Sequence, residues 1–132
     1  MSRILVAEDD PHILRVISLW LSRQGHEVLE ARNGLAAWGI LEQQIPDILI
    51  TDINMPGMDG LALLEKLHET GRQPRGIVVL TNRWDHREIG QKLAERGVQV
   101  VPKPFSPTKL AELIGNMDQN EKASQEPCTP QS

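Results

Sequence analysis

Short apolar runs alternate along the chain with segments whose apolar residues recur every three or four positions. This alternation of strand-length runs with helical periods is typical of strand–helix–strand units that build a parallel sheet. We expect strands at Ile4–Ala7, His26–Ala31, Ile48–Thr51, Gly76–Leu80 and Gln99–Pro102. Because proline lacks the backbone donor of a sheet ladder, Pro102 predicts an edge position for the last strand.

Segments with a helical period are expected after each of these strands. The first is the clearest, because its apolar residues share one helix face. These residues are Ile13, Val16, Ile17, Trp20 and Leu21. Asp10 before Pro11 is typical of an N-cap and a first helical residue, and Gly25 marks the end. The other helices are expected from Gly34 to Leu41, from Leu61 to about Gly71, at Asp85–Arg96 and from Pro107 to Met117.

Length and composition favour one intracellular domain. The chain has 132 residues, enough to bury an ordinary core, and we expect the domain at residues 1–118. From Gln119 to Ser132 almost nothing is apolar, so a disordered tail is expected at residues 119–132. Cys128 is the single cysteine, which excludes an internal disulfide. With no signal-peptide pattern or membrane-span-length apolar run, a cytoplasmic protein is expected.

The charge balance is mildly acidic. The chain carries 14 Lys and Arg against 18 Asp and Glu, a formal net charge of −4. No basic stripe is present that would follow a phosphate backbone. Direct binding to nucleic acid is therefore not expected.

Acidic residues follow two of the predicted strands. Glu8 and Asp9 come after the first strand, and Asp52 follows the third. At the carboxyl edge of a parallel sheet these carboxylates would repel one another unless a cation lay between them, and oxygen ligands suit Mg²⁺. Asp52 is the better nucleophile candidate because it stands alone at its strand end, although an aspartate there could also simply start a turn. Asp10 is better interpreted as a helix cap.

Two further polar residues are expected at the same edge. The hydroxyl of Thr81 could donate to a phosphoryl oxygen, although a threonine at a strand end is common for its β propensity alone. Lys103 lies between two prolines that restrict its backbone, and its ammonium could serve as a point charge for a phosphoryl group. A lone lysine is usually a solvated surface charge. The joint placement of these residues, rather than any one of them, indicates phosphoryl chemistry.

With these residues, the chain resembles the receiver domains of two-component response regulators, in particular the single-domain, chemotaxis-regulator-like members. The resemblance runs from Arg3 to about Met117 and rests on four motifs. They are ILVAEDDP at Ile4–Pro11, PDILITDINMPGMDG at Pro46–Gly60, VVLT at Val78–Thr81 and KPF at Lys103–Phe105. The resemblance implies a flavodoxin-like doubly wound α/β fold. Its five-stranded parallel sheet would have the order 2-1-3-4-5, with five helices on both faces.

The resemblance also implies roles for individual residues. Asp52 would be the phosphoacceptor, with Thr81 and Lys103 binding phosphoryl oxygens and the Lys103–Pro104 bond cis. Mg²⁺ would be held by Asp9 and Asp52, by Glu8 through water and by the backbone carbonyl of Asn54. A sensor histidine kinase or histidine phosphotransfer protein would supply the phosphoryl group, and a conformational change would carry the signal to a downstream protein. Beyond its own phosphorylation and slow autodephosphorylation, no enzyme activity is implied.

Departures from the family pattern affect the expected switch. The position three before Lys103, usually aromatic in the family, is Val100, so the aromatic rotamer switch is absent. Asn82 stands where the family mostly has a small residue, and Arg83 and Trp84 follow it. We expect phosphorylation to occur and the switch to be weak or read out differently.

Two other functions are compatible with parts of the pattern. A degenerate receiver could act as a phosphorylation-independent binding platform, which Val100 and Asn82 keep open. An aspartyl-phosphate enzyme resembling the haloacid dehalogenases would need Asp-x-Asp, but Asn54 stands two residues after Asp52. The general acid/base of such an enzyme is missing.

Leu14 and Leu19 lie off the predicted buried face of the first helix. They could be scattered exposed apolar residues, which are common on protein surfaces. The resemblance implies instead a docking surface for the helical phosphotransfer domain of a kinase.

Overall fold

Strands and helices alternate from Arg3 to Thr81 in the described part of the chain. The computed structural model describes residues 2–53, 58, 60–81, 98–102 and 106–125, without the side chains of 102, 107 and 118–125. The strands are β1 (Arg3–Ala7), β2 (Glu27–Ala31), β3 (Ile48–Asp52), β4 (Gly76–Thr81) and β5 (Gln99–Pro102). The helices are α1 (Pro11–Arg23), α2 (Gly34–Gln43), α3 (Gly60–Thr70) and α5 (Pro107–Gln125). The predicted helix Asp85–Arg96 lies outside the described residues.

The strands form one parallel sheet in the order β2-β1-β3-β4-β5, which confirms the predicted order. All residues of β3 and β4 are buried, as expected for central strands covered on both faces. β5 pairs with β4 in a register that ends with Thr81 opposite Pro102, and it forms one edge of the sheet. The edge position predicted from Pro102 is therefore confirmed.

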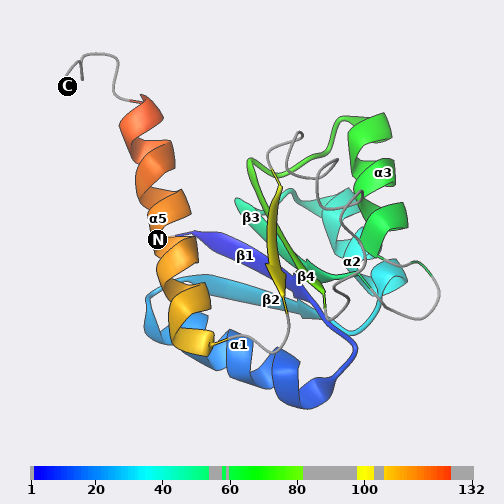
Figure 1. Ribbon diagram of the computed structural model, residues 1–132. Helices are drawn as coiled ribbons and strands as arrows, with labels where there is room; N and C mark the ends of the chain where they lie inside the picture. Colours follow the sequence, from blue (N-terminus) through cyan, green and yellow to red (C-terminus); the bar gives the residue numbers. More distant parts are fainter. Residues whose placement is uncertain (1, 54–57, 59, 82–97, 103–105, 126–132) are drawn as a thin grey trace.

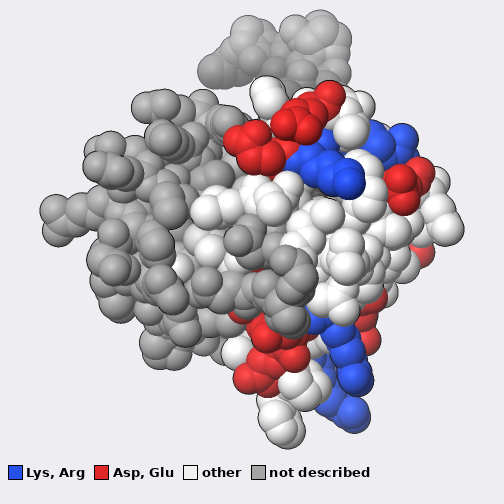
Figure 2. All heavy atoms as spheres, turned by 90° about the vertical axis from the view of Figure 1, so that its right-hand side faces the viewer, with Lys and Arg blue, Asp and Glu red and all other residues white. Residues whose placement is uncertain are grey.

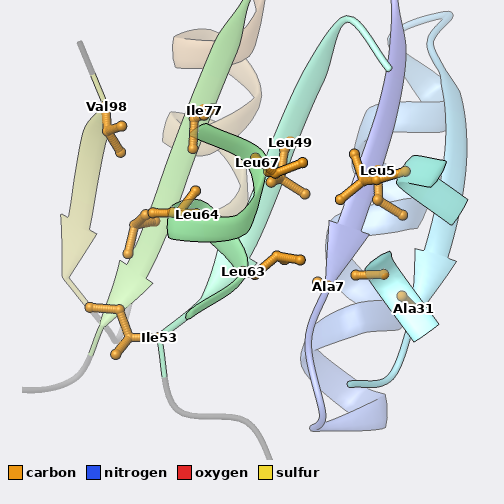
Figure 3. Close-up of a cluster of buried hydrophobic side chains, with 13 residues drawn as sticks. Leu5, Ala7, Ala31, Leu49, Ile53, Leu63, Leu64, Leu67, Ile77 and Val98 are labelled. Carbon is orange, nitrogen blue, oxygen red and sulfur yellow. The ribbon is translucent and has the colours of Figure 1, made fainter. Parts of the chain in front are cut away.

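Helices cover both faces of the sheet (Figure 1). Successive side chains of a strand point to opposite faces, so β1 contributes to two cores. Leu5 packs with residues of α2 and α3, as Figure 3 shows for Leu63 and Leu67 of α3. Ile4 packs in the second core with residues of α1 and α5. Two separate apolar layers therefore hold the sheet in place and fix its carboxyl edge.

The buried face of α1 differs from the predicted one. Leu14, Ile17 and Leu21 face the core, whereas Val16 is 38% exposed. Two apolar stripes share Ile17 and Leu21, and both fit the helical period. Packing of α1 against the sheet and α5 selects the stripe that contains Leu14.

The helix ends follow the predicted capping residues. The Asp10 side chain accepts hydrogen bonds from the amides of His12 at 2.9 Å and Ile13 at 3.4 Å. Gly25 has φ of 91° and Gly71 has φ of 73°, a left-handed conformation that glycine adopts without steric cost. These residues lie just beyond α1 and α3 and account for where those helices end.

The last helix is longer than predicted. We expected a disordered tail from Gln119, but α5 continues to Gln125. The apolar period stops near Met117, while the following Glu, Lys, Ala and Gln residues have good helix propensity, which accounts for the longer helix. Residues 126–132 lie outside the described residues, so the domain boundary at 118 stays a prediction. Among the helices described, none is long and apolar enough to cross a membrane.

Candidate acidic site at the carboxyl edge of the sheet

Three carboxylates meet where β1 and β3 end. Ala7 and Thr51 are partners in the parallel ladder, so the residues that follow them leave the sheet side by side. One carboxylate oxygen from each of Glu8, Asp9 and Asp52 lies within 4.8 Å of the others. The carboxyl edge therefore brings together the three acids that the sequence singled out.

The acids differ in exposure. Glu8 is fully buried, Asp52 is 5% exposed and Asp9 is an exposed residue. The site thus has two carboxylates set into the protein and one at its mouth. Such an arrangement is open to solvent on the Asp9 side.

The backbone fixes the orientation of Glu8. Its amide donates to the carbonyl oxygen of Ala31 at 3.0 Å, which ties the end of β1 to the end of β2. Its Oε2 accepts from the amide of Asp10 at 3.1 Å. Asp10 itself caps α1 with its carboxylate, so the cap interpretation is supported and Asp10 lies outside the acidic group.

The chain around Asp52 is held by hydrogen bonds on the side of β4 and α3, away from β1. The amide of Ile53 donates to the Leu80 carbonyl at 3.0 Å, and the Thr51 hydroxyl donates to the Asp52 carbonyl at 3.1 Å. The amide of Gly60 donates to the Ile53 carbonyl at 2.8 Å, which joins the start of α3 to the end of β3. These contacts keep the end of β3 beside β4.

Glycine is required at position 60 by the close approach of α3 to the end of β3. A Cβ atom there would lie 2.3 Å from the Asp52 carbonyl oxygen and 2.9 Å from the Cα of Ile53. The backbone can approach that closely only because glycine has no side chain. This contact was not predicted from the sequence, where Gly60 was identified only as the last residue of the Pro46–Gly60 motif, although the Asp-Gly pair before an apolar helix was a usable clue.

Thr81 ends β4 at the same edge. It is 6% exposed, and Leu80 directly before it is the ladder partner of Asp52. Thr81 therefore lies one position beyond the register of Asp52. Lys103, Asn54 and Asn82 lie outside the described residues, as does the Lys103–Pro104 bond.

The acidic group has the donor chemistry of a magnesium site. Several carboxylates at such short distances repel one another, and a divalent cation would remove that repulsion. Carboxylate oxygens are hard ligands of the kind that Mg²⁺ prefers. The residues present therefore fit this ion.

A groove of about 530 Å³ lies between α1 and the end of β2. The residues that line it are Pro11, His12, Leu14, Arg15, Ser18, Leu19, Ser22, Glu30 and Arg32. Leu19 is 50% exposed, whereas Leu14 is 4% exposed and belongs to the core. The expectation that Leu14 lies off the buried face of α1 is therefore wrong, because α1 turns this side chain toward the sheet. The docking role expected for this helix stays a prediction.

Charged residues of both signs are mixed on the face seen in Figure 2, which is the right-hand side of Figure 1. Lys and Arg side chains lie beside Asp and Glu side chains there, with uncharged surface between the groups. Among the described residues of that face, no continuous positive patch is present.

Sequence comparison assigns most of the chain to one family. The family model of the response regulator receiver domain matches residues 4–115. The chain is 36% identical over 115 residues to the chemotaxis protein CheY1 of Helicobacter pylori, a match that covers 85% of this chain and 93% of that protein. It is 34% identical over 111 residues to the response regulator GtcR of Aneurinibacillus migulanus, but spans only 45% of that longer protein.

Solved structures agree with this assignment. An N-terminal domain of a protein from Wolinella succinogenes superposes with a TM-score of 0.83 at 28% identity, covering 95% of this chain and all of that one (100%). The CheY-like receiver domain protein from Methanospirillum hungatei superposes with a TM-score of 0.81 at 28% identity, covering 93% of this chain and 98% of that one. With its parallel sheet, its acidic group and these similarities, the chain belongs to the response regulator receiver domain family.

Proposed function

We propose that this domain accepts a phosphoryl group on Asp52 from a histidine kinase or histidine phosphotransfer protein and passes the signal to a downstream protein. The observation that carries the proposal is the approach of Glu8, Asp9 and Asp52 to within 4.8 Å of one another at the carboxyl edge. That geometry offers a nucleophile and a place for a cation in one site. Membership of the receiver family supplies the reaction class.

Among these acids, Asp52 is the best nucleophile. Glu8 is fully buried, and its Oε2 is engaged by the Asp10 amide. Asp9 lies at the exposed side of the site, where it can serve as a ligand. Asp52 ends a central strand at the carboxyl edge and, at 5% exposed, is less deeply buried than Glu8. A carboxylate in that position can attack phosphorus without leaving the sheet.

In the transfer step, an Asp52 oxygen forms a bond to phosphorus as the bond between phosphorus and the donor's imidazole nitrogen breaks. The electron pair of the broken bond leaves with the imidazole. Thr81 and Lys103 would bind the phosphoryl oxygens, and Asp52, Asp9, Glu8 through water and the Asn54 carbonyl would hold Mg²⁺. The bound ion would neutralise charge on the carboxylates and on the transferred group.

The donor and the target are proteins in this proposal, and the domain acts in the cytoplasm without direct contact to nucleic acid or membrane. The groove along α1 is the surface we assign to donor docking, and Leu19 is its exposed apolar residue. Its proximity to the acidic site follows from the chain, because α1 begins at Pro11, directly after Asp9 and Asp10. A donor seated on α1 would therefore lie near the phosphoacceptor.

The test is the intact-protein mass after incubation with Mg²⁺ and acetyl phosphate. Wild type should gain one phosphoryl group, and Asp52→Asn should gain none. Asp10→Asn is the matched control, since asparagine also caps helices and Asp10 lies outside the acidic group. It should be phosphorylated like wild type.

If wild type gains nothing, the same measurement is repeated with a phosphorylated histidine kinase domain as donor. No gain with either donor would contradict the proposal and favour the binding-platform alternative. A gain on both wild type and Asp52→Asn would contradict the assignment of Asp52.

A further inference from the structure

Gly34, the first residue of α2, lies against the backbone of Met58. A Cβ atom at position 34 would be 1.8 Å from the Met58 carbonyl oxygen, 2.7 Å from its carbonyl carbon and 2.9 Å from its Cβ. Gly34 is buried, and its φ is not positive, so space rather than backbone conformation requires glycine here. The start of α2 is thus in close contact with Met58.

Met58 is close in the sequence to Gly60, which lies against the proposed phosphoacceptor Asp52. Met58 lies two positions before Gly60 in the sequence. The Cα of Gly60 sits so close to the end of β3 that an added Cβ would be 2.3 Å from the Asp52 carbonyl oxygen. The two close backbone approaches, of Gly34 to Met58 and of Gly60 to Asp52, are therefore separated by a single residue of the chain.

The start of α2 is held in place by hydrogen bonds and by packing. The Asn33 side chain accepts from the Ala36 amide at 2.7 Å, and the Asn33 carbonyl accepts from the Ala37 amide at 3.0 Å. Ala37 and Leu41 are fully buried in the core. A side chain added at position 34 would therefore displace the Met58 segment more readily than the helix.

We propose that Gly34 is a positioning residue for the acidic site, acting through Met58 and Gly60 on Asp52. Its missing side chain lets the backbone of Met58 lie against the start of α2. The inference rests on the proposed function, since its consequence is measured at the Mg²⁺ and phosphoryl site.

Gly34→Ala should weaken Mg²⁺ binding by about tenfold or more, the size of effect seen when supporting contacts around metal ligands are removed. Its phosphorylation by acetyl phosphate should slow at a fixed Mg²⁺ concentration and recover in part as Mg²⁺ is raised. Gly39→Ala is the matched control. It lies in the same helix, and a Cβ there would meet nothing within 4 Å. Alanine at that position should raise the melting temperature and leave Mg²⁺ affinity unchanged.

The experiment is a Mg²⁺ titration followed by ¹⁵N NMR on wild type, Gly34→Ala, Gly39→Ala and the double variant. The double variant adds helix propensity in case Gly34→Ala alone is too unstable to study. In wild type, the amide resonances of Gly34 and Met58 should shift with the same dissociation constant as that of Asp52, while that of Gly39 stays in place. These wild-type resonances test the coupling of Gly34 to the Mg²⁺ site even if neither Gly34 variant folds.

A Gly34 resonance that does not respond to Mg²⁺, or a folded Gly34→Ala variant with wild-type affinity, would overturn the inference while leaving the proposed function intact. Wild type that neither binds Mg²⁺ nor accepts a phosphoryl group would overturn the proposed function, and the inference with it. A general loss of stability alone would lower the melting temperature without changing the affinity of the folded protein, so the two measurements separate positioning from folding.

Discussion

The guanidinium group of Arg72 closes the end of α2, where its Nε donates to the carbonyl oxygen of Leu41 at 2.9 Å. One of its terminal nitrogens donates to the neighbouring Glu42 carbonyl at 2.7 Å. The last carbonyls of a helix have no partner within the helix, so these bonds satisfy groups that would otherwise need water. Arg72 follows α3 and Gly71, and it therefore ties two helices together on one face of the sheet.

Arg72→Ala should lower the free energy of unfolding by about 1–3 kcal/mol, because two charged hydrogen bonds to α2 are lost. Arg72→Lys should recover only part of this, since lysine lacks the fork that reaches both carbonyls. Urea unfolding followed by circular dichroism measures the difference.

Arg75→Ala is the control for a simple loss of positive charge nearby. Arg75 pairs with Asp47 at 3.6 Å on a partly exposed surface, and such pairs contribute about 0–1 kcal/mol. Equal losses for Arg72→Ala and Arg75→Ala would mean that the bonds to α2 add nothing.

The sequence was sufficient for those features that depend on local pattern. The strands, the N-cap at Asp10 and the edge position of the strand containing Pro102 follow from residue type and spacing. The grouping of Glu8 with Asp52 follows as well, because parallel strands bring their carboxyl ends to one edge.

The features that were not predicted from the sequence depend on contacts between residues far apart in the chain. Arg72 donates a hydrogen bond to Leu41, and Gly34 lies against the backbone of Met58. Neither contact can be recognised from the local spacing of apolar and polar residues. The orientation of α1 could not be predicted for a related reason. The stripe with Leu14 and the stripe with Val16 fit the helical period equally well, and packing against the sheet buries the one with Leu14. These choices are made by tertiary packing rather than by propensity.

Leu14 and Leu19 should respond differently to truncation. Leu14→Ala should lower the free energy of unfolding by about 2–5 kcal/mol, as is usual for a buried leucine. Leu19→Ala, at a half-exposed position, should change it by no more than about 0.5 kcal/mol. Thermal unfolding of both variants tests the observed orientation of α1. Small losses at both positions would instead fit the face predicted from the sequence, which contains neither leucine.

Mg²⁺ should stabilise the folded domain, because a ligand bound only to the folded state adds about 2.7 kcal/mol at a hundred times its dissociation constant. In EDTA, Asp9→Asn should be at least as stable as wild type, since it removes one of the mutually repelling carboxylates near Glu8 and Asp52. In Mg²⁺ the order should reverse. Differential scanning calorimetry in both buffers measures these shifts. An Asp9→Asn variant that gains as much from Mg²⁺ as wild type would show that Asp9 is not a ligand.

Position 100 should determine how strongly phosphorylation is transmitted to β5. Val100 is 36% exposed and pairs with Val79, while Thr81 pairs with Pro102 two residues further along. A valine has no ring that could turn toward a displaced Thr81, so the response of wild type should be small. Val100→Tyr should enlarge the acetyl-phosphate-induced shifts of amide resonances along β4 and β5 in ¹⁵N NMR spectra, with Asp52→Asn in the same background as the unresponsive control. Shifts of equal size in wild type and Val100→Tyr would mean that the absence of an aromatic residue does not limit the switch.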